Sequence, residues 1–147
     1  MKLVSACLCG INCRYDGGSK PDKKLIDLAR AGKAIPVCPQ QLGGLKTPRP
    51  KSEIIGGTGS DVLDGNARVI NLEGEDVTKE FINGAFAALK IVKINNIDEA
   101  ILKAGCPSCS CGKIYNGAFH GVLIDGDGVT AALLKRNGVR VHDEKER

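Results

Sequence analysis

The sequence of 147 residues predicts an α/β fold, a single domain over residues 1–147 with a mostly parallel sheet flanked by helices and cysteine loops at the carboxyl edge. Short apolar runs alternate with segments of helical periodicity, which is the pattern of β-α-β units. A chain of this length corresponds to one ordinary domain, which buries about two-thirds of its unfolded surface without disulfides. Three of the expected strands end close to a cysteine, so their loops are expected at one edge of the sheet.

The first part of the chain contains two expected strands of the sheet with one helix between them. Residues 2–6 form a short apolar strand, and residues 7–18 are too rich in Gly, Asn and Asp for a regular element. Pro21 suits the start of a helix that ends at Gly32, because glycine favours the position that closes a helix. Residues 34–37 are expected to form the second strand.

The rest of the chain begins with two strands that are expected to pair with each other outside the main sheet. The alternation of helices and strands then resumes. Residues 52–55 and 67–71 are expected to pair as strands around glycine-containing connections. Apolar residues from Phe81 to Val92 recur with helical spacing after a helix start at Asp76. The remaining expected elements are a strand at 99–103, a helix at 127–136 capped by Asp127, a strand at 139–141 and a charged tail at 143–147.

Composition excludes several classes of protein. The net charge is +4 and the isoelectric point is near 8.7, with the charge spread along the chain, so there is no strong nucleic-acid signal. This mildly basic balance suits a small anionic ligand. No apolar run approaches the roughly 18 residues of a membrane span, and the first five residues are too short for a signal peptide. A cytoplasmic location without membrane association is therefore expected.

Seven cysteines are unusual in a chain that has no export signal. In a reducing compartment they serve metal binding or catalysis more often than disulfides. Cys7, Cys38 and Cys109 follow strands whose carboxyl ends share one edge, so three loops are expected to bring three thiolates together. Three soft thiolates suit a [4Fe–4S] cluster with one open iron.

The cysteine spacings leave other interpretations open. A closed zinc site needs four ligands, and Cys13 or Cys111 could supply the fourth. Cys106 and Cys109 have the Cys-x-x-Cys spacing that also serves thiol redox sites. Some of the cysteines could instead be small residues of the core.

Charged residues near the cysteine loops are further candidates. Arg14, Lys46, Arg49 and Lys103 could hold a phosphate or polarise a carbonyl, and solvated surface charge is an equal alternative for each. Asp16 is expected to be a turn residue rather than an acid in the reaction.

The chain resembles the thiouracil desulfidase family over nearly its whole length. The matching segments are Val4–Leu8, Cys13–Gly17, Val37–Pro39, Gln41–Leu45, Thr47–Pro50, Gly74–Thr78, Ile101–Ala104, Pro107–Cys109, Ile114–Tyr115 and Gly126–Ala131. The resemblance implies a small cytoplasmic α/β enzyme with a [4Fe–4S] cluster held by Cys7, Cys38 and Cys109, and with Cys13 as a candidate fourth ligand. It further implies that the open iron takes sulfur from thiouracil or thiouridine monophosphate, that water supplies the oxygen, and that no net redox change occurs.

Two positions depart from the family pattern. Gln40 stands where the family usually has a glutamate that acts in proton transfer, and an amide can neither take nor give a proton at neutral pH. Cys106 stands where the family usually has a serine. In this interpretation Asp16, Cys106 or an iron-bound water takes over proton transfer, and the candidates for substrate binding are Arg14, Arg49, Lys103 and Ser108.

Two rival functions follow from the same residues. Gln40 and Cys106 favour a non-catalytic protein that binds an iron–sulfur cluster or zinc, as a carrier or a sensor. Cys106 and Cys109 would be the working pair of a thiol oxidoreductase.

Overall fold

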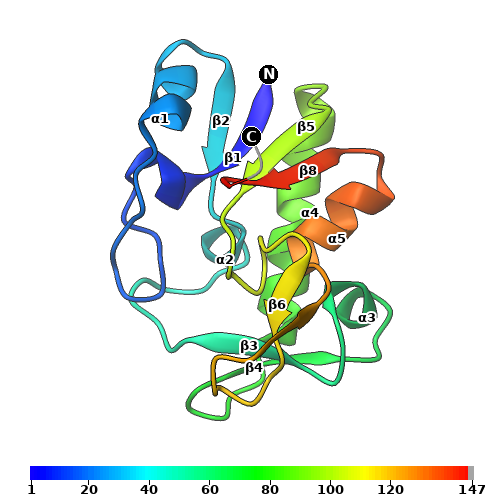
Figure 1. Cartoon of the computed structure of the whole chain (residues 1–147). Helices are drawn as coiled ribbons and strands as arrows, with labels where there is room; N and C mark the ends of the chain where they lie inside the picture. The colour runs from blue at the N-terminus through cyan, green and yellow to red at the C-terminus, as the bar shows by residue number, and fades with distance from the viewer. Residues whose placement is uncertain (146–147) are drawn as a thin grey trace.

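The computed structural model describes residues 1–145, and a four-stranded parallel sheet forms its centre (Figure 1). The strand order is β2 (Ala34–Val37), β1 (Lys2–Ser5), β5 (Glu99–Leu102) and β8 (Arg140–Asp143). All three neighbouring pairs are parallel, so the predicted mostly parallel sheet is confirmed. The loops that follow β1, β2 and β5 therefore leave the sheet at the same edge.

Helices cover both faces of the sheet. Leu3 of β1 belongs to a buried cluster with α4 (Thr78–Ile94) and α5 (Val129–Arg136). The next residue, Val4, belongs to a second cluster with Leu25 of α1 (Lys23–Arg30) on the opposite face. Successive side chains of a strand point to opposite faces, and both faces of a parallel sheet are covered, which explains the consecutive buried apolar residues of β1 and β5.

Several short elements lie outside the central sheet. The pair of strands predicted outside the main sheet is confirmed as the antiparallel pair of β3 (Ser52–Ile55) and β4 (Arg68–Asn71). The sequence analysis did not identify the other elements, because each is too short to show a period. They are the 3-10 turn η1 (Ala6–Cys9), α2 (Pro39–Leu42), α3 (Gly59–Leu63), β6 (Lys113–Tyr115) and β7 (Leu123–Asp125), the last two forming a hairpin.

Several expected boundaries were wrong, and the helix expected to start at Asp76 begins at Thr78. Asp127 does not cap α5, because the N-cap is Gly128 and the Asp127 carboxylate instead accepts the Gly112 N–H at 2.8 Å. The last strand extends to Asp143, which pairs with Leu102, so this residue is not in a tail. The neighbouring Glu144 also contacts the body of the protein, whereas residues 146–147 of the expected tail lie outside the described residues.

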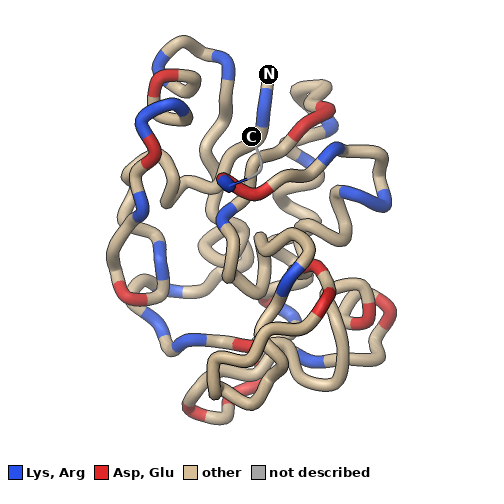
Figure 2. The backbone as a smooth tube through the Cα atoms, in the orientation of Figure 1, with Lys and Arg blue, Asp and Glu red and all other residues tan. Residues whose placement is uncertain are grey.

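Figure 2 shows basic and acidic residues spread over all parts of the backbone. No helix in residues 1–145 is long and apolar enough to cross a membrane.

Candidate functional site

A cavity of about 250 Å³ opens where the loops after β1, β2 and β5 meet. Its lining includes five of the seven cysteines, which are Cys7, Cys13, Cys38, Cys106 and Cys109. The other two thiols point elsewhere: Cys9 donates toward the carbonyl oxygen of Leu25 at 3.8 Å, and Cys111 toward that of Val141 at 3.4 Å. The expected convergence of three strand-end cysteines is therefore present in the structure.

Cys7, Cys13 and Cys38 form one group of thiols in this cavity. Cys13 is buried and hydrogen-bonds with both neighbours, and these bonds raise the pKa of its own thiol. The bond from Cys13 lowers the pKa of Cys38 to about 7, and the N–H of Gln41 and the Arg49 guanidinium act in the same direction. The bond from Cys13 also lowers the pKa of Cys7, with help from Arg14. Cys7 and Cys38 are thus the members of this group that favour the thiolate form.

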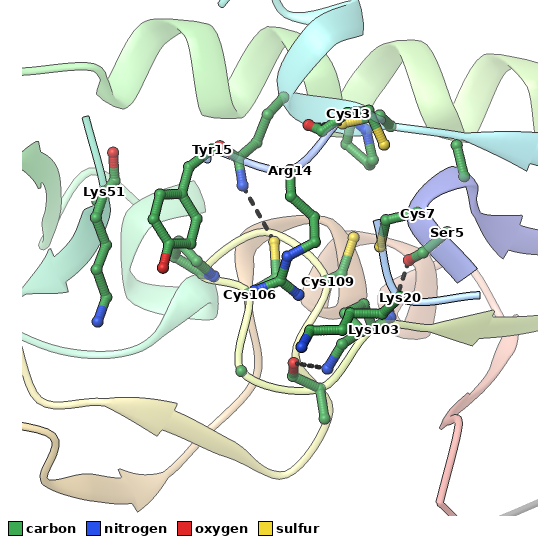
Figure 3. A pocket seen from close by; sticks show the side chains of 18 of the residues that line it. Ser5, Cys7, Cys13, Arg14, Tyr15, Lys20, Lys51, Lys103, Cys106 and Cys109 are labelled. Atoms are coloured by element: carbon green, nitrogen blue, oxygen red, sulfur yellow. Dashed lines mark hydrogen bonds between the residues drawn. The ribbon is translucent and has the colours of Figure 1, made fainter. Parts of the chain in front are cut away.

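Cys106 and Cys109 form the second group, on the loop after β5. Figure 3 shows Cys7, Cys106 and Cys109 directed into the same space. The sulfur of Cys106 accepts hydrogen bonds from the Cys109 thiol, from the N–H groups of Cys109 and Ser108, and from Gln40. These donors lower the pKa of Cys106 to about 6, whereas the bond to Cys106 and burial raise the pKa of Cys109.

Gln40 and Arg49 connect the two groups of thiols. The Nε2 of Gln40 donates to the Cys106 sulfur at 3.1 Å, and its Oε1 accepts from the Nε of Arg49 at 2.8 Å. The same guanidinium donates to the carbonyl oxygen of Cys13 at 2.9 Å. It also donates to the carbonyl oxygen of Lys46 and to the hydroxyl of Thr47. Arg49 is only 9% exposed, so it braces the cavity wall and has little capacity left for a substrate.

The cavity is strongly cationic. Arg14, Lys20, Arg49, Lys51 and Lys103 line it, and among residues 1–145 no carboxylate does. Lys103 is neutralised by Glu144 at 2.9 Å, whereas Lys20 and Lys51 have no carboxylate partner in the described part of the chain. The buried Nε of Arg14 has no hydrogen-bond partner there, and the Asp16 carboxylate lies 3.9 Å from it, too far for a hydrogen bond. An orphaned cationic donor beside thiols is what an anionic group in the cavity would satisfy.

Besides Cys111, three of the predicted candidates do not line the cavity, namely Lys46, Ser108 and Asp16. Ser108 is fully buried, and its hydroxyl shares a 2.7 Å hydrogen bond with that of Thr130 behind the wall. Asp16 accepts the N–H of Gly18 at 2.9 Å in an exposed turn, as expected of a turn residue. Neither side chain faces a ligand in the cavity, so neither the assignment of Ser108 to substrate binding nor that of Asp16 to proton transfer has geometric support.

The sequence analysis missed four lining residues with charged or aromatic side chains, namely Tyr15, Lys20, Lys51 and Tyr115. Tyr15 lies in the Cys13–Gly17 segment that matches the family, directly after the candidate Arg14. The sequence therefore offered a reason to include it among the site residues. Lys51 and Tyr115 reach the cavity only through the packing of β3 and β6, so no local signal points to them.

The comparisons with known proteins show the family to which the chain belongs. Residues 3–146 match the profile of the 2-thiouracil desulfurase family. The chain belongs to this family. It is 51% identical over 146 residues to the uncharacterized protein YbbK of Bacillus subtilis, covering 99% of this chain and 97% of the relative. A solved structure of the [4Fe–4S]-dependent thiouracil desulfidase TudS is similar, with a TM-score of 0.86 and 44% identity over 98% of this chain and 90% of that one.

The thiols fit a cluster better than a single ion. Among residues 1–145, no three His, Cys, Asp or Glu side chains converge closely enough to hold one metal ion, so the zinc alternative has no support. The ligand sulfurs of a cubane cluster lie farther apart, because each binds a different iron. Soft thiols on three loops, with an unpartnered Arg14 nitrogen beside them, form a donor set suited to an anionic iron–sulfur cluster.

Proposed function

We propose that this protein is a [4Fe–4S]-dependent enzyme that hydrolyses the carbon–sulfur bond of a thiolated pyrimidine, without net redox change. The observation that carries the proposal is the convergence of Cys7, Cys38 and Cys109 on one cationic cavity, in a chain of the 2-thiouracil desulfurase family. The similarity to TudS supports the cofactor.

Cys7, Cys38 and Cys109 would hold the cluster. They come from three different loops, which matches a cluster with one iron free of protein ligands. When bound, such a cluster supplies a Lewis acid that attracts the substrate sulfur. Cys13, hydrogen-bonded between Cys7 and Cys38, is positioned to donate its S–H to their sulfurs.

The unpaired cations favour a nucleoside monophosphate over a free base. Lys20 and Lys51 line the cavity without a carboxylate partner in the described residues, and a phosphate monoester carries up to about two negative charges at pH 7. Figure 3 shows Lys51 on the side of Tyr15 and Lys20 near Cys7 and Lys103, so each ammonium is a separate candidate for contact with the phosphate. Lys103 is less suited to this role, because Glu144 and the carbonyl oxygen of Ala104 already occupy its ammonium.

Proton transfer falls to Cys106 among the candidates within the cavity. Gln40 is an amide with a fixed orientation, and the Asp16 carboxylate lies in an outer turn. The Cys106 sulfur faces the cavity and can hold a proton between its removal from water and its return to the ring or the sulfur.

The decisive experiment is anaerobic purification and cluster reconstitution, followed by measurement of sulfide release from 4-thiouridine monophosphate and from 2-thiouracil. We expect brown protein with absorbance near 400 nm and sulfide in step with product, faster with the monophosphate. Brown protein that releases no sulfide from either compound would support the non-catalytic carrier or sensor, which the amide of Gln40 favours. Colourless protein with bound zinc, or colourless metal-free protein with an oxidisable Cys106–Cys109 pair, would overturn the proposal.

A further inference from the structure

Aromatic side chains are scarce in this chain but are present at its cavity. The sequence has three Phe, two Tyr and no Trp, and both tyrosines line the cavity. Neither tyrosine hydroxyl has a hydrogen-bond partner within residues 1–145. Hydrogen bonds of their hydroxyl groups within the described residues therefore do not explain the placement of these two rings.

Tyr15 is held in place by its backbone, while its ring remains accessible. Its carbonyl oxygen accepts the N–H of Arg49 at 2.8 Å, which ties the loop to the Thr47–Pro50 segment. The loop also closes on itself, since the N–H of Arg14 donates to the carbonyl oxygen of Gly18 at 3.1 Å. Tyr15 nevertheless remains 38% exposed. A rigid backbone that carries an exposed ring is a preorganised contact surface.

The two tyrosines have different cations beside them. The guanidinium carbon of Arg14 lies 5.8 Å from the centre of the Tyr15 ring, and the Nζ of Lys51 lies 5.2 Å from that of Tyr115. Figure 3 shows the Tyr15 ring between Lys51 and the Cys106 sulfur, on the side of the cavity where the unpaired Lys51 also lies. A nucleotide whose reacting carbon lies beside the thiols and whose phosphate lies near Lys51 would pass Tyr15 with its base.

We propose that Tyr15 stacks on the pyrimidine ring of the substrate and so selects a nucleotide over other phosphate esters. This inference rests on the proposed function, because it assumes a pyrimidine in the cavity. Planar bases stack on aromatic side chains whatever their sequence context, since each base presents a π-face. Removal of one such contact weakens binding by about five- to hundredfold.

The test uses the reconstituted protein under anaerobic conditions and two unreactive probes. Uridine 5′-monophosphate contains the base, the sugar and the phosphate, whereas ribose 5-phosphate lacks the base. Equilibrium dialysis gives the Kd of each probe for the wild type and for Tyr15→Phe, Tyr15→Leu and Phe86→Leu. Phe86 is a matched control because it is an exposed aromatic residue on α4, away from the cavity lining.

We expect the wild type and Tyr15→Phe to bind uridine 5′-monophosphate at least fivefold more tightly than ribose 5-phosphate. Tyr15→Leu should lose that preference while its affinity for ribose 5-phosphate stays unchanged, and Phe86→Leu should match the wild type. Equal loss of affinity for both probes in Tyr15→Leu would show a merely structural role and overturn the inference, as would a wild type without preference.

A failure of the proposed monophosphate is distinguishable from a failure of the stacking. If neither probe binds the wild type, the phosphate part of the proposed function is wrong, and the Kd of free 2-thiouracil is compared between the wild type and Tyr15→Leu. A higher Kd of Tyr15→Leu for 2-thiouracil would then support the stacking, and an unchanged Kd would overturn it.

Discussion

The amide of Gln40 has a fixed orientation because its two ends have different partners. The Arg49 guanidinium can only donate, so the Oε1 of Gln40 must face it, and Nε2 is left to donate to Cys106. A glutamate at position 40 would keep the bond to Arg49 but would place its second oxygen against the sulfur. With Cys106 as a thiolate, two acceptors would then face each other, whereas a serine at position 106 could donate its hydroxyl proton.

The Gln40→Glu and Cys106→Ser substitutions should therefore be strongly non-additive. The double variant restores a carboxylate that can carry a proton and a serine that can donate to it, so sulfide release should rise by about 10²-fold over the wild type. Gln40→Glu alone should gain much less, because its new charge faces the Cys106 sulfur. The measurement is the rate of sulfide release from 4-thiouridine monophosphate at equal iron content. A wild type as fast as the double variant would contradict this account of proton transfer.

The assignment of the ligand cysteines remains a prediction that metal analysis can test. Cys7→Ala, Cys38→Ala and Cys109→Ala should each abolish or strongly deplete iron, because three ligands leave no redundancy. Cys9→Ala is the matched control, since its thiol points to Leu25 outside the cavity and its loss should leave iron nearly intact. The measurement is iron and acid-labile sulfide per chain after anaerobic purification. Equal depletion by Cys9→Ala would refute the assignment.

The position of Gln40 depends on the contact between two helices. The short α2 packs against α4, and glycine stands on both sides of the contact. A Cβ on Gly84 would lie 1.9 Å from the carbonyl oxygen of Pro39, and one on Gly43 would lie 1.9 Å from that of Glu80. Both obstacles are backbone atoms, so the helices can approach this closely only without side chains at these two positions.

Gly84→Ala should consequently destabilise the protein although alanine is the better helix former. The gain in helix propensity is about 1 kcal/mol, and forcing the helices apart costs about 3 kcal/mol or more, so the free energy of unfolding should fall by about 2 kcal/mol. Asn83→Ala, at an exposed neighbouring position of α4, should be neutral or slightly stabilising. Urea denaturation of both variants measures this. If Gly84→Ala were as stable as Asn83→Ala, α2 would be able to move away from α4 without cost. That result would contradict the close contact between the two helices.

At the scale of the whole molecule, the end of the described chain closes the site. Glu144, just after β8, accepts the N–H of Ala104 at 2.8 Å and pairs with the Lys103 ammonium at 2.9 Å. Both partners belong to the loop after β5 that carries Cys106 and Cys109. Burial opposes the charge of Glu144, but these two donors outweigh it, so its pKa lies below the usual value.

This carboxylate should make stability depend on pH. Because the pKa of Glu144 is lower in the folded than in the unfolded chain, its contribution is present above the unfolded value of about 4.3 and is lost as the pH falls through the folded value. Glu144→Gln should thus be less stable than the wild type at pH 7, and the difference should shrink below about pH 4. Glu73→Gln, at an exposed position, is the control and should show no such difference. Urea unfolding at several pH values tests this, and a constant difference between wild type and Glu144→Gln would contradict it.

The sequence predicted the sheet and the convergence of the cysteines for one reason. Apolar runs of strand length with helices between them predict parallel strands, and parallel strands end at a common edge. The positions of Cys7, Cys38 and Cys109 followed from that rule alone. The short elements η1 and α2 did not, because a single helical turn has no period to recognise.

The sequence by itself determined the kinds of group at the site: soft thiols, unpaired cations and an amide in place of an acid. Only the tertiary structure decided which of them face the cavity. Arg49 is held by the carbonyl oxygen of Cys13 in the cavity wall, and Lys103 is neutralised by Glu144. Ser108 is hydrogen-bonded to Thr130 behind the wall. Lys51 and Tyr115 line the cavity from other segments of the chain. The physical reason is that a side chain's partner is set by distances in space between residues far apart in sequence. Residue type alone states what a group can bind, and the folded chain selects which partner it meets.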